Sequence, residues 1–333
     1  MLYRRKQNIM MFEEQLSRKP NLYPWTQDYI NAMWSGHWTP NEFNFQSDIH
    51  DYKVTLNSQE KEIIKNTLAA IAQIEVAVKK FWLKLGDNLP HPSINDLGAE
   101  MAHIETIHNI AYEKLIKVLN LEHIFEENMT LDIIKGRVKY LYKYNHKYYK
   151  DSKKQYIYSL ILFTLYVENV SLFSQFYIIN WFNRYRNVLK DTAQQVAYTA
   201  KEETLHALVG IKIVTELRKE YPELFDEDLE QKILAETEEA YKCECKIIDW
   251  ILGGFDDKKL NSAILKEFIK HRLNESIAAV GFKPIFNSID QSLLEESEWF
   301  NEDVLGNTST DFFYARPVQY SKGHTSFDAE ELF

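Results

Sequence analysis

The sequence predicts an all-α protein, a bundle of long helices, and three observations point to it. Only 10 Gly and 8 Pro occur in 333 residues, so the chain has little of the turn punctuation that many-stranded folds need. Apolar residues make up 45% of the chain and recur at helical spacing through most of it. Carboxylates and imidazoles also lie at mid-length in several of these stretches, which indicates a bundle with polar chemistry in its interior.

The elements are expected in the following order. Residues 1–25 predict an irregular arm, and residues 26–55 predict short helical turns and loops. Ser58 is the expected cap of a long helix that stops at Gly86. Residues 26–305 form the predicted bundle domain, and residues 306–333, rich in Ser, Thr, Gly and charge, predict a flexible tail. The long helices are expected at about 58–85, 93 or 95 to 120, 131–149, 153–182, 188–220, 226–252 and 258–279.

The composition narrows the classes of function. A net charge of −10 argues against binding of nucleic acid through the bulk surface. The chain opens without a secretory signal pattern, and its uninterrupted apolar runs stay below the ~18 residues of a membrane span. Two cysteines suit a reducing compartment. We therefore expect a soluble cytoplasmic protein that binds neither membrane nor nucleic acid.

Two Glu-x-x-His pairs stand out, Glu105 with His108 and Glu203 with His206. Each lies on a predicted long helix. The helix before each pair carries a single carboxylate at mid-length, and these two carboxylates are Glu75 and Glu168. Four carboxylates and two imidazoles on four helices are the set that a bundle uses to hold two transition-metal ions.

Helical phase separates these pairs from a third one, Glu100 with His103. At about 100° per residue, Glu105 falls within about 60° of His108, on the same side as the apolar residues of that helix. His103 falls about 140° away, on the polar side. The sequence therefore predicts that His103 faces solvent, whereas Glu105 and His108 face the core.

A single carboxylate–imidazole pair on an apolar face is ordinarily a satisfied buried pair, because unpaired it would cost several kcal/mol. The same arrangement recurs at Glu75, at Glu168 and at Glu203 with His206. Four inward carboxylates in one bundle require cations between them. Two imidazoles and four carboxylates without a thiolate select iron or manganese over structural zinc or copper.

Three segments, residues 104–112, 201–206 and 311–320, resemble the small, radical-generating subunit of class I ribonucleotide reductase. The resemblance extends from Trp38-Thr39-Pro40 to the tail. It implies a ferritin-like bundle with a carboxylate-bridged dimetal site, whose oxidant starts the reduction of ribonucleotides in a separate large subunit. The metal ligands that it implies are Glu75, Glu105, His108, Glu168, Glu203 and His206.

The same resemblance implies roles for further residues. Tyr112 falls where the family's tyrosyl radical forms, and Trp38 matches the tryptophan of its radical-transfer chain. Glu202 stands where many members have Asp. Tyr320 matches the tail tyrosine that passes the radical on, with Tyr314 as a second candidate. The tail is expected to dock on the large subunit, and the chain is expected to form a homodimer.

One position departs from the family's usual pattern. The first metal ligand is usually Asp, but here it is Glu75. Glu at this position occurs in manganese–iron members that replace the radical tyrosine by Phe, and in a dimanganese subclass that keeps the tyrosine without storing the radical on it. Because Tyr112 is kept, the sequence favours Mn/Mn, with Mn/Fe and Fe/Fe as alternatives. Lys79 lies one turn after Glu75 and either points an ammonium at the site, favouring superoxide over dioxygen, or extends outward to solvent.

Three other hypotheses compete with the interpretation as a ribonucleotide reductase small subunit. A stand-alone ligand-binding oxidase or oxygenase on the same bundle would have no need of Trp38, Tyr320 or the tail. An iron-storage protein would be shorter, and a helical scaffold would leave the buried carboxylates without a purpose. The sequence leaves open the metal, the oxidant, the oxidation of Tyr112, the need for an activating flavoprotein, and the choice between di- and triphosphate substrates.

Overall fold

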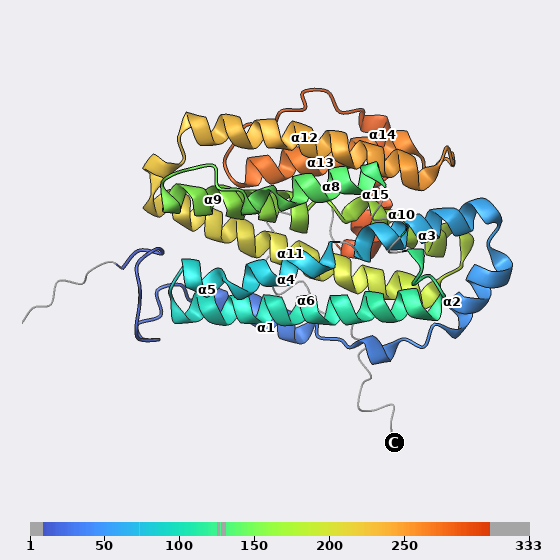
Figure 1. Ribbon diagram of the computed structural model, residues 1–333, viewed down its shortest axis with the longest axis horizontal. Coiled ribbons are helices and arrows are strands. Elements are labelled where there is room, and N and C mark those ends of the chain that lie inside the picture. Colours follow the sequence, from blue (N-terminus) through green and yellow to red (C-terminus); the bar gives the residue numbers. More distant parts are fainter. Residues whose placement is uncertain (1–8, 73, 125–126, 128–130, 307–333) are drawn as a thin grey trace, which may run out of the picture.

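The computed structural model describes residues 9–306 with the exception of 73, 125, 126 and 128–130; the side chains of residues 75–78 also lie outside the description. Throughout the described residues the regular elements are helices. In Figure 1, α4, α6 and α11 lie along the long axis, and α12 and α13 form a layer beyond α8 and α9. The helices of the bundle are α1 (Thr26–Ser35), α3 (Ser58–Ala72), α4 (Glu75–Leu83), α5 (Leu85–Asn88), α6 (Pro92–Val118), α8 (Asp132–Leu141), α9 (Ser152–Leu162), α10 (Phe173–Arg186), α11 (Lys190–Glu220), α12 (Glu227–Leu252) and α13 (Ser262–Ala279).

Shorter elements connect these helices. Residues 9–25 run ahead of α1 without regular structure, and a series of short turns then leads to α3. The short elements are η1 (Pro40–Glu42), α2 (Gln46–His50), η2 (Asp51–Thr55), η3 (Tyr142–Asn145), η4 (Phe163–Glu168), η5 (Pro222–Leu224), α14 (Gln291–Glu295), α15 (Glu298–Phe300) and η6 (Asn301–Leu305).

Side-chain caps fix where several helices begin. Asp226 accepts the backbone N–H of Leu229 at the start of α12 (2.9 Å). At the start of α3 the cap is Asn57 and not Ser58, which was the expected cap. The Asn57 side chain accepts the N–H of Glu60 (3.0 Å), and the Glu60 carboxylate accepts the N–H of Asn57 (3.0 Å), which forms a capping box.

The helix expected at 58–85 is divided, and this is a correction. α3 ends at Ala72, α4 begins at Glu75 and ends at Leu83, and the one-turn α5 follows. Ile74 donates its N–H to the carbonyl of Ile71 (3.0 Å), a tighter turn than an α-helix makes. No Gly or Pro marks this break in the sequence. The helix that carries Glu75 therefore starts at that residue.

The helix expected at 153–182 is also divided. α9 passes into the π-helix η4, which ends at Glu168, and α10 starts only at Phe173. Two buried arginines take up carbonyls that the break leaves without helix partners: Arg272 donates to Asn169 O (2.9 Å), and Arg137 donates to Ser171 O. Arg137 also donates to Ala70 O (3.1 Å) at the end of α3. One arginine of α8 therefore holds both irregular segments.

The remaining helices agree with expectation to within a few residues, except that the helix expected at 131–149 stops at Leu141 and continues only as η3. The core lies between the layers. The segment Ser152–Arg186 is long and apolar enough to cross a membrane by length and composition alone, but its apolar window is entirely buried within the protein. Core helices of globular proteins have this property.

Candidate metal centre

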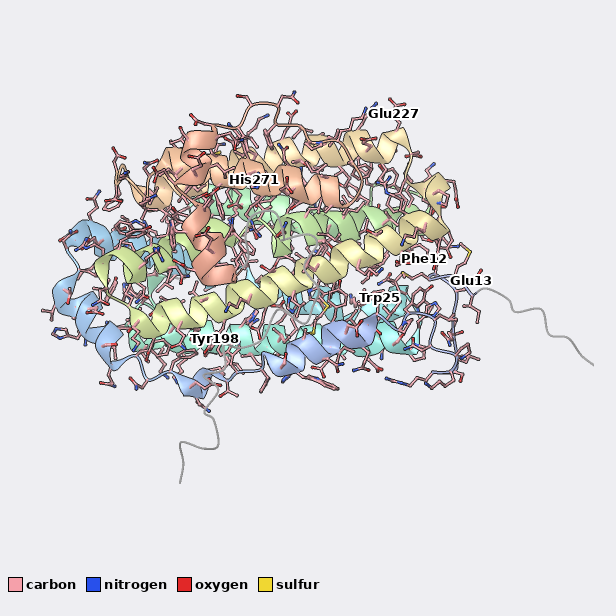
Figure 2. All side chains as sticks on the ribbon, turned by 180° about the vertical axis from the view of Figure 1, so that it is seen from behind. Phe12, Glu13, Trp25, Tyr198, Glu227 and His271 are labelled. Atoms are coloured by element: carbon pink, nitrogen blue, oxygen red, sulfur yellow. The ribbon has the colours of Figure 1, made fainter. Side chains whose placement is uncertain are left out.

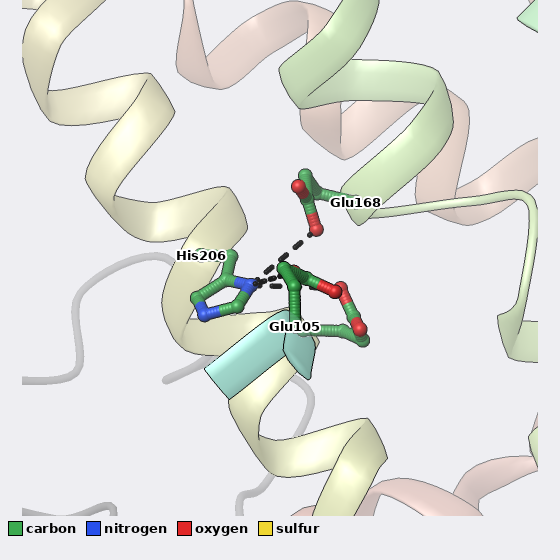
Figure 3. Close-up of side chains that lie close together, drawn as sticks. Glu105, Glu168 and His206 are labelled. Carbon is green, nitrogen blue, oxygen red and sulfur yellow. Dashed lines mark ion pairs between the residues drawn. The ribbon is translucent and has the colours of Figure 1, made fainter. Parts of the chain in front are cut away.

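Four buried side chains meet between η4, α6 and α11. Glu105, Glu168, Glu203 and His206 each place a ligand atom within 4.8 Å of those of the others. Figure 3 shows Glu105 and Glu168 directed toward the imidazole of His206. The His206 Nδ1 atom lies 2.8 Å from Glu105 Oε1 and 3.6 Å from Glu168 Oε2. All of them are at most 2% exposed.

His108 joins the same cluster from the next turn of α6. Its Nδ1 atom lies 3.4 Å from Glu105 Oε2 and 3.0 Å from Glu203 Oε1. The Glu203 carboxylate therefore lies between the two imidazoles, because its other oxygen is 3.8 Å from His206 Nδ1. Both Glu-x-x-His pairs thus point inward, as helical phase predicts, and His103 is exposed.

Burial and neighbouring charges have opposing effects on the pKa values of the carboxylates in this cluster. Burial raises the pKa of Glu168, and the neighbouring Glu203 raises it further, to well above the usual carboxyl range. Burial also acts to raise the pKa of Glu203, but contacts with Glu168, His108 and His206 outweigh it and lower that pKa. The arrangement of like carboxylates around two imidazoles needs positive charge between them.

The imidazoles respond in the complementary way. Burial acts to lower the pKa of His206, but its contacts with Glu105, Glu168 and Glu203 raise it to well above the ordinary value. The same holds for His108, with Glu202 among the carboxylates that raise it. Divalent cations supply the charge that these protons otherwise bring, so metal ions and protons compete for the cluster.

The donor atoms fit metal ions better than they fit one another. Among the described residues, both Glu105 oxygens, Glu168 Oε2 and both His206 nitrogens are buried and make no hydrogen bond of acceptable geometry. All of these atoms except His206 Nε2 lie at ion-pair distances from a neighbouring group. Buried polar atoms that converge without pairing are costly unless a cation binds them. Oxygen and imidazole donors without thiolate suit iron and manganese.

Two tryptophans are connected to this cluster by hydrogen bonds. Trp82 of α4 donates its Nε1–H to Glu168 Oε1 (2.6 Å). Trp82 was not predicted as part of the site, although its spacing of seven residues from Glu75 places it on the same helical face. A buried indole N–H needs an acceptor, and this one orients a carboxylate of the cluster.

Trp38 makes the second connection. Its Nε1–H donates to Glu202 Oε2 (2.9 Å), and the same oxygen lies 2.7 Å from His108 Nε2. The indole is 1% exposed and stacks on the His108 ring, with centroids 6.3 Å apart and planes at 24°. One carboxylate oxygen therefore links the imidazole of the cluster to Trp38. The extra methylene of Glu202 relative to Asp does not prevent this link.

Of the remaining predicted site residues, some lie within the described part of the structure and some lie outside it. Tyr112 is buried on α6, one turn after His108. Lys79 is half-buried on α4, one turn after Glu75, and the described residues give it no contact with the cluster. The side chain of Glu75 lies outside the described part of the structure, although its backbone opens α4. Tyr314 and Tyr320 belong to residues 307–333, which also lie outside it.

Comparisons with known proteins agree on one family. Residues 17–292 match the family model described as ribonucleotide reductase, small chain. A curated relative from Chlamydia pneumoniae, named ribonucleoside-diphosphate reductase subunit beta, is 22% identical, over 90% of this chain and 88% of its own.

Two solved structures show the same fold. A class I ribonucleotide reductase structure from Bacillus halodurans aligns with a TM-score of 0.75 at 21% identity, covering 83% of this chain and 98% of that one. An R2-like ligand-binding oxidase with a Mn/Fe cofactor aligns with a TM-score of 0.64 at 19% identity, covering 77% of this chain and 93% of that one. At these identities the structural likeness establishes the fold, and the family model establishes the family.

Proposed function

Since this chain belongs to the ribonucleotide reductase small-chain family, we infer that it is the radical-generating subunit of a class I ribonucleotide reductase. It starts the reduction of ribonucleotides to deoxyribonucleotides, which takes place in a partner large subunit. The observation that carries this inference is the buried Glu and His cluster joined to Trp38 through one oxygen of Glu202.

The metal ligands that we propose are Glu75, Glu105, His108, Glu168, Glu203 and His206. The bound metal pair supplies a stored one-electron oxidant, which no set of ordinary side chains supplies. We propose two manganese ions, on the ground that Glu75 occurs together with Tyr112; manganese–iron and di-iron pairs are the alternatives. Lys79, half-buried one turn after Glu75, would favour an anionic oxidant such as superoxide.

The residues around the cluster orient it, exclude water and hold protons. Trp82 fixes one oxygen of Glu168, which leaves the other oxygen directed at His206. Glu202 holds the His108 ring and the Trp38 indole on the same oxygen. When Trp38 loses an electron, its N–H proton stays against a carboxylate that favours positive charge. Because all these groups are buried, water is kept from the path.

Further parts of the proposal concern the tail and the assembly. We propose that the tail docks on the large subunit, and that Tyr320, or Tyr314 in its place, passes the oxidising equivalent onward. Tyr112 is the alternative site of the stored oxidant, in place of the metal pair itself. A homodimer and a cytoplasmic location are proposed from the family. A ligand-binding oxidase is the alternative function, supported by the likeness in fold, but it gives no purpose to the link between Trp38 and the cluster.

Metal analysis tests the site first. Protein from its own host is examined by elemental analysis and electron paramagnetic resonance. Manganese near two ions per chain, with a coupled-manganese signal, supports the dimanganese proposal. Iron with a tyrosyl signal instead assigns the radical to Tyr112 and overturns the metal assignment. If neither metal is present at a stoichiometric level, the proposed metal site itself is contradicted. Glu168→Ala protein is the control and should bind metal poorly.

Turnover tests the radical path. Tyr320→Phe should abolish nucleotide reduction with the large subunit present but leave metal loading intact, because a phenylalanine ring is far harder to oxidise. Tyr314→Phe is the matched control from the same tail, expected to retain turnover. If Tyr314→Phe alone is inactive, Tyr314 carries the step. If both variants retain turnover, the proposed path through the tail is wrong.

A further inference from the structure

Three aromatic rings meet where the segment after α1 crosses α11. The Trp38 and Tyr198 ring centroids are 5.9 Å apart with planes at 51°, and Phe43 lies 5.7 Å from Trp38 and 6.0 Å from Tyr198. Trp38 and Phe43 are buried, whereas Tyr198 is half-buried. Figure 2 shows Tyr198 beside α11, on the side of the molecule opposite the view of Figure 1. Tyr198 is thus an oxidisable ring that contacts Trp38 and reaches solvent.

The position of Tyr198 on α11 makes this contact specific. It lies four residues before Glu202, so both residues fall on one face of the helix. Glu202 accepts the Trp38 N–H, and Tyr198 packs against the indole ring. Gln194, one turn earlier, donates its side-chain N–H to the Tyr198 phenol oxygen (3.0 Å). One stretch of α11 therefore supplies both the hydrogen-bond partner and a ring partner of Trp38.

We propose that Tyr198 is a redox-active residue that gives one electron to oxidised Trp38 and so brings the oxidising equivalent from the buried indole to the protein surface. This inference rests on the proposed function, because the oxidant originates at the metal centre. One electron moves from Tyr198 to Trp38, whose N–H stays bonded to Glu202. The phenolic O–H bond of Tyr198 breaks, its proton passes to solvent water, and a neutral phenoxyl radical remains.

A purely structural role makes a different prediction. If Tyr198 only covers Trp38, then Phe at position 198 keeps the cover and should preserve function. Phe43 provides the matched comparison, because it packs on Trp38 at nearly the same distance without a readily oxidised ring. Replacing Phe43 by Leu disturbs packing around Trp38 but removes no oxidisable group.

The direct test is to place 3-aminotyrosine, which is more easily oxidised than tyrosine, at position 198. The metal-loaded protein is mixed with the large subunit and substrate, and electron paramagnetic resonance is recorded. We expect an aminotyrosyl radical that disappears when Trp38 is also replaced by Phe and that persists with Phe43→Leu. The same amino acid at Tyr185, which is 40% exposed and away from Trp38, should give no radical.

Turnover and a tail control complete the experiment. Tyr198→Phe should lower nucleotide reduction by about tenfold or more, with metal content and helical circular dichroism unchanged. Absence of a radical at position 198, or unchanged turnover of Tyr198→Phe, overturns the inference. Aminotyrosine in place of Tyr320 distinguishes failure of the Tyr198 inference from failure of the proposed function. An aminotyrosyl radical at position 320 but not at position 198 overturns only the role of Tyr198. A radical at neither position contradicts the proposed function as well.

Discussion

Replacing Gly210 by Ala should separate α11 from the π-helix η4 and thereby displace a proposed metal ligand. A methyl group at Gly210 would lie 2.1 Å from Thr164 Oγ1, 2.6 Å from Cγ2 and 2.8 Å from Cβ. Rotation of the Thr164 side chain moves the first two atoms but not Cβ. Carbon atoms normally approach to about 3.5 Å, so the backbone of η4 must retreat by roughly 0.7 Å.

The expected magnitude follows from this displacement. Overpacking of a close-packed core costs about 1–3 kcal/mol, so the free energy of unfolding should fall by that amount. The midpoint of thermal unfolding should fall by roughly 2–4 °C for each kcal/mol. Glu168 lies four residues after Thr164 on the same π-helix, and it should move with it. Displacement of a ligand's support lowers metal affinity by about 10-fold or more.

Denaturation by heat and urea measures the first effect, and equilibrium metal titration measures the second. Gly136→Ala is the matched control: no atom lies within 4 Å of the added methyl group, so this helix should gain about 0.5–1 kcal/mol. Adding Thr164→Gly to Gly210→Ala removes all three clashing atoms and should restore metal affinity. Thr164 Oγ1 makes no hydrogen bond within the described residues, so none is lost. Wild-type stability and affinity in Gly210→Ala would refute the reasoning.

Periodicity and residue chemistry predicted the bundle, because long amphipathic helices have apolar residues at a regular helical spacing that can be recognised in the sequence. The inward direction of Glu105 and His108, and the outward direction of His103, also followed from helical phase alone. The break at Ile74, between α3 and α4, and the irregular segment 163–172 did not follow, because neither contains Gly or Pro. Their carbonyls are taken up by arginines more than 30 residues away in sequence, a long-range effect that local pattern does not encode.

Two further predictions concern stability. Asp48 accepts the N–H (2.6 Å) and the hydroxyl (2.6 Å) of Thr192 at the start of α11, so Asp48→Ala should cost about 1–2 kcal/mol in urea denaturation; no change would contradict the capping role. Burial acts to raise the pKa of Glu236, but Lys143 and Lys232 together outweigh it and lower that pKa, so this carboxylate stabilises the fold above its unfolded-state pKa and loses that contribution as pH falls through the lowered folded-state pKa. Lys143→Met should therefore lessen the acid loss of thermal stability, and an unchanged acid limb would exclude this pair.

Arg137 gives the sharpest test of how the two helix breaks support the metal site. The buried guanidinium pairs with Glu244 (3.2 Å) and donates to Ala70 O, near the end of α3, and to Ser171 O, between η4 and α10. Burial raises the pKa of Glu244 despite this pair, so the ion pair is needed chiefly because its carboxylate is buried. Arg137→Met leaves that buried carboxylate without a cation, with only the Tyr140 hydroxyl as a donor, and should cost about 3–5 kcal/mol.

The double variant Arg137→Met with Glu244→Leu separates the two roles of Arg137. It removes the unpaired charge and should recover most of the free energy of unfolding, because an apolar pair replaces a buried ion pair at little cost. It does not return donors to Ala70 O and Ser171 O, so the ends of α3 and η4 remain unsupported. Stability should therefore recover while metal affinity stays low. If stability and metal affinity both recover in the double variant, the two helix breaks keep their shape without Arg137. The packing around Glu168 would then be the cause of the breaks.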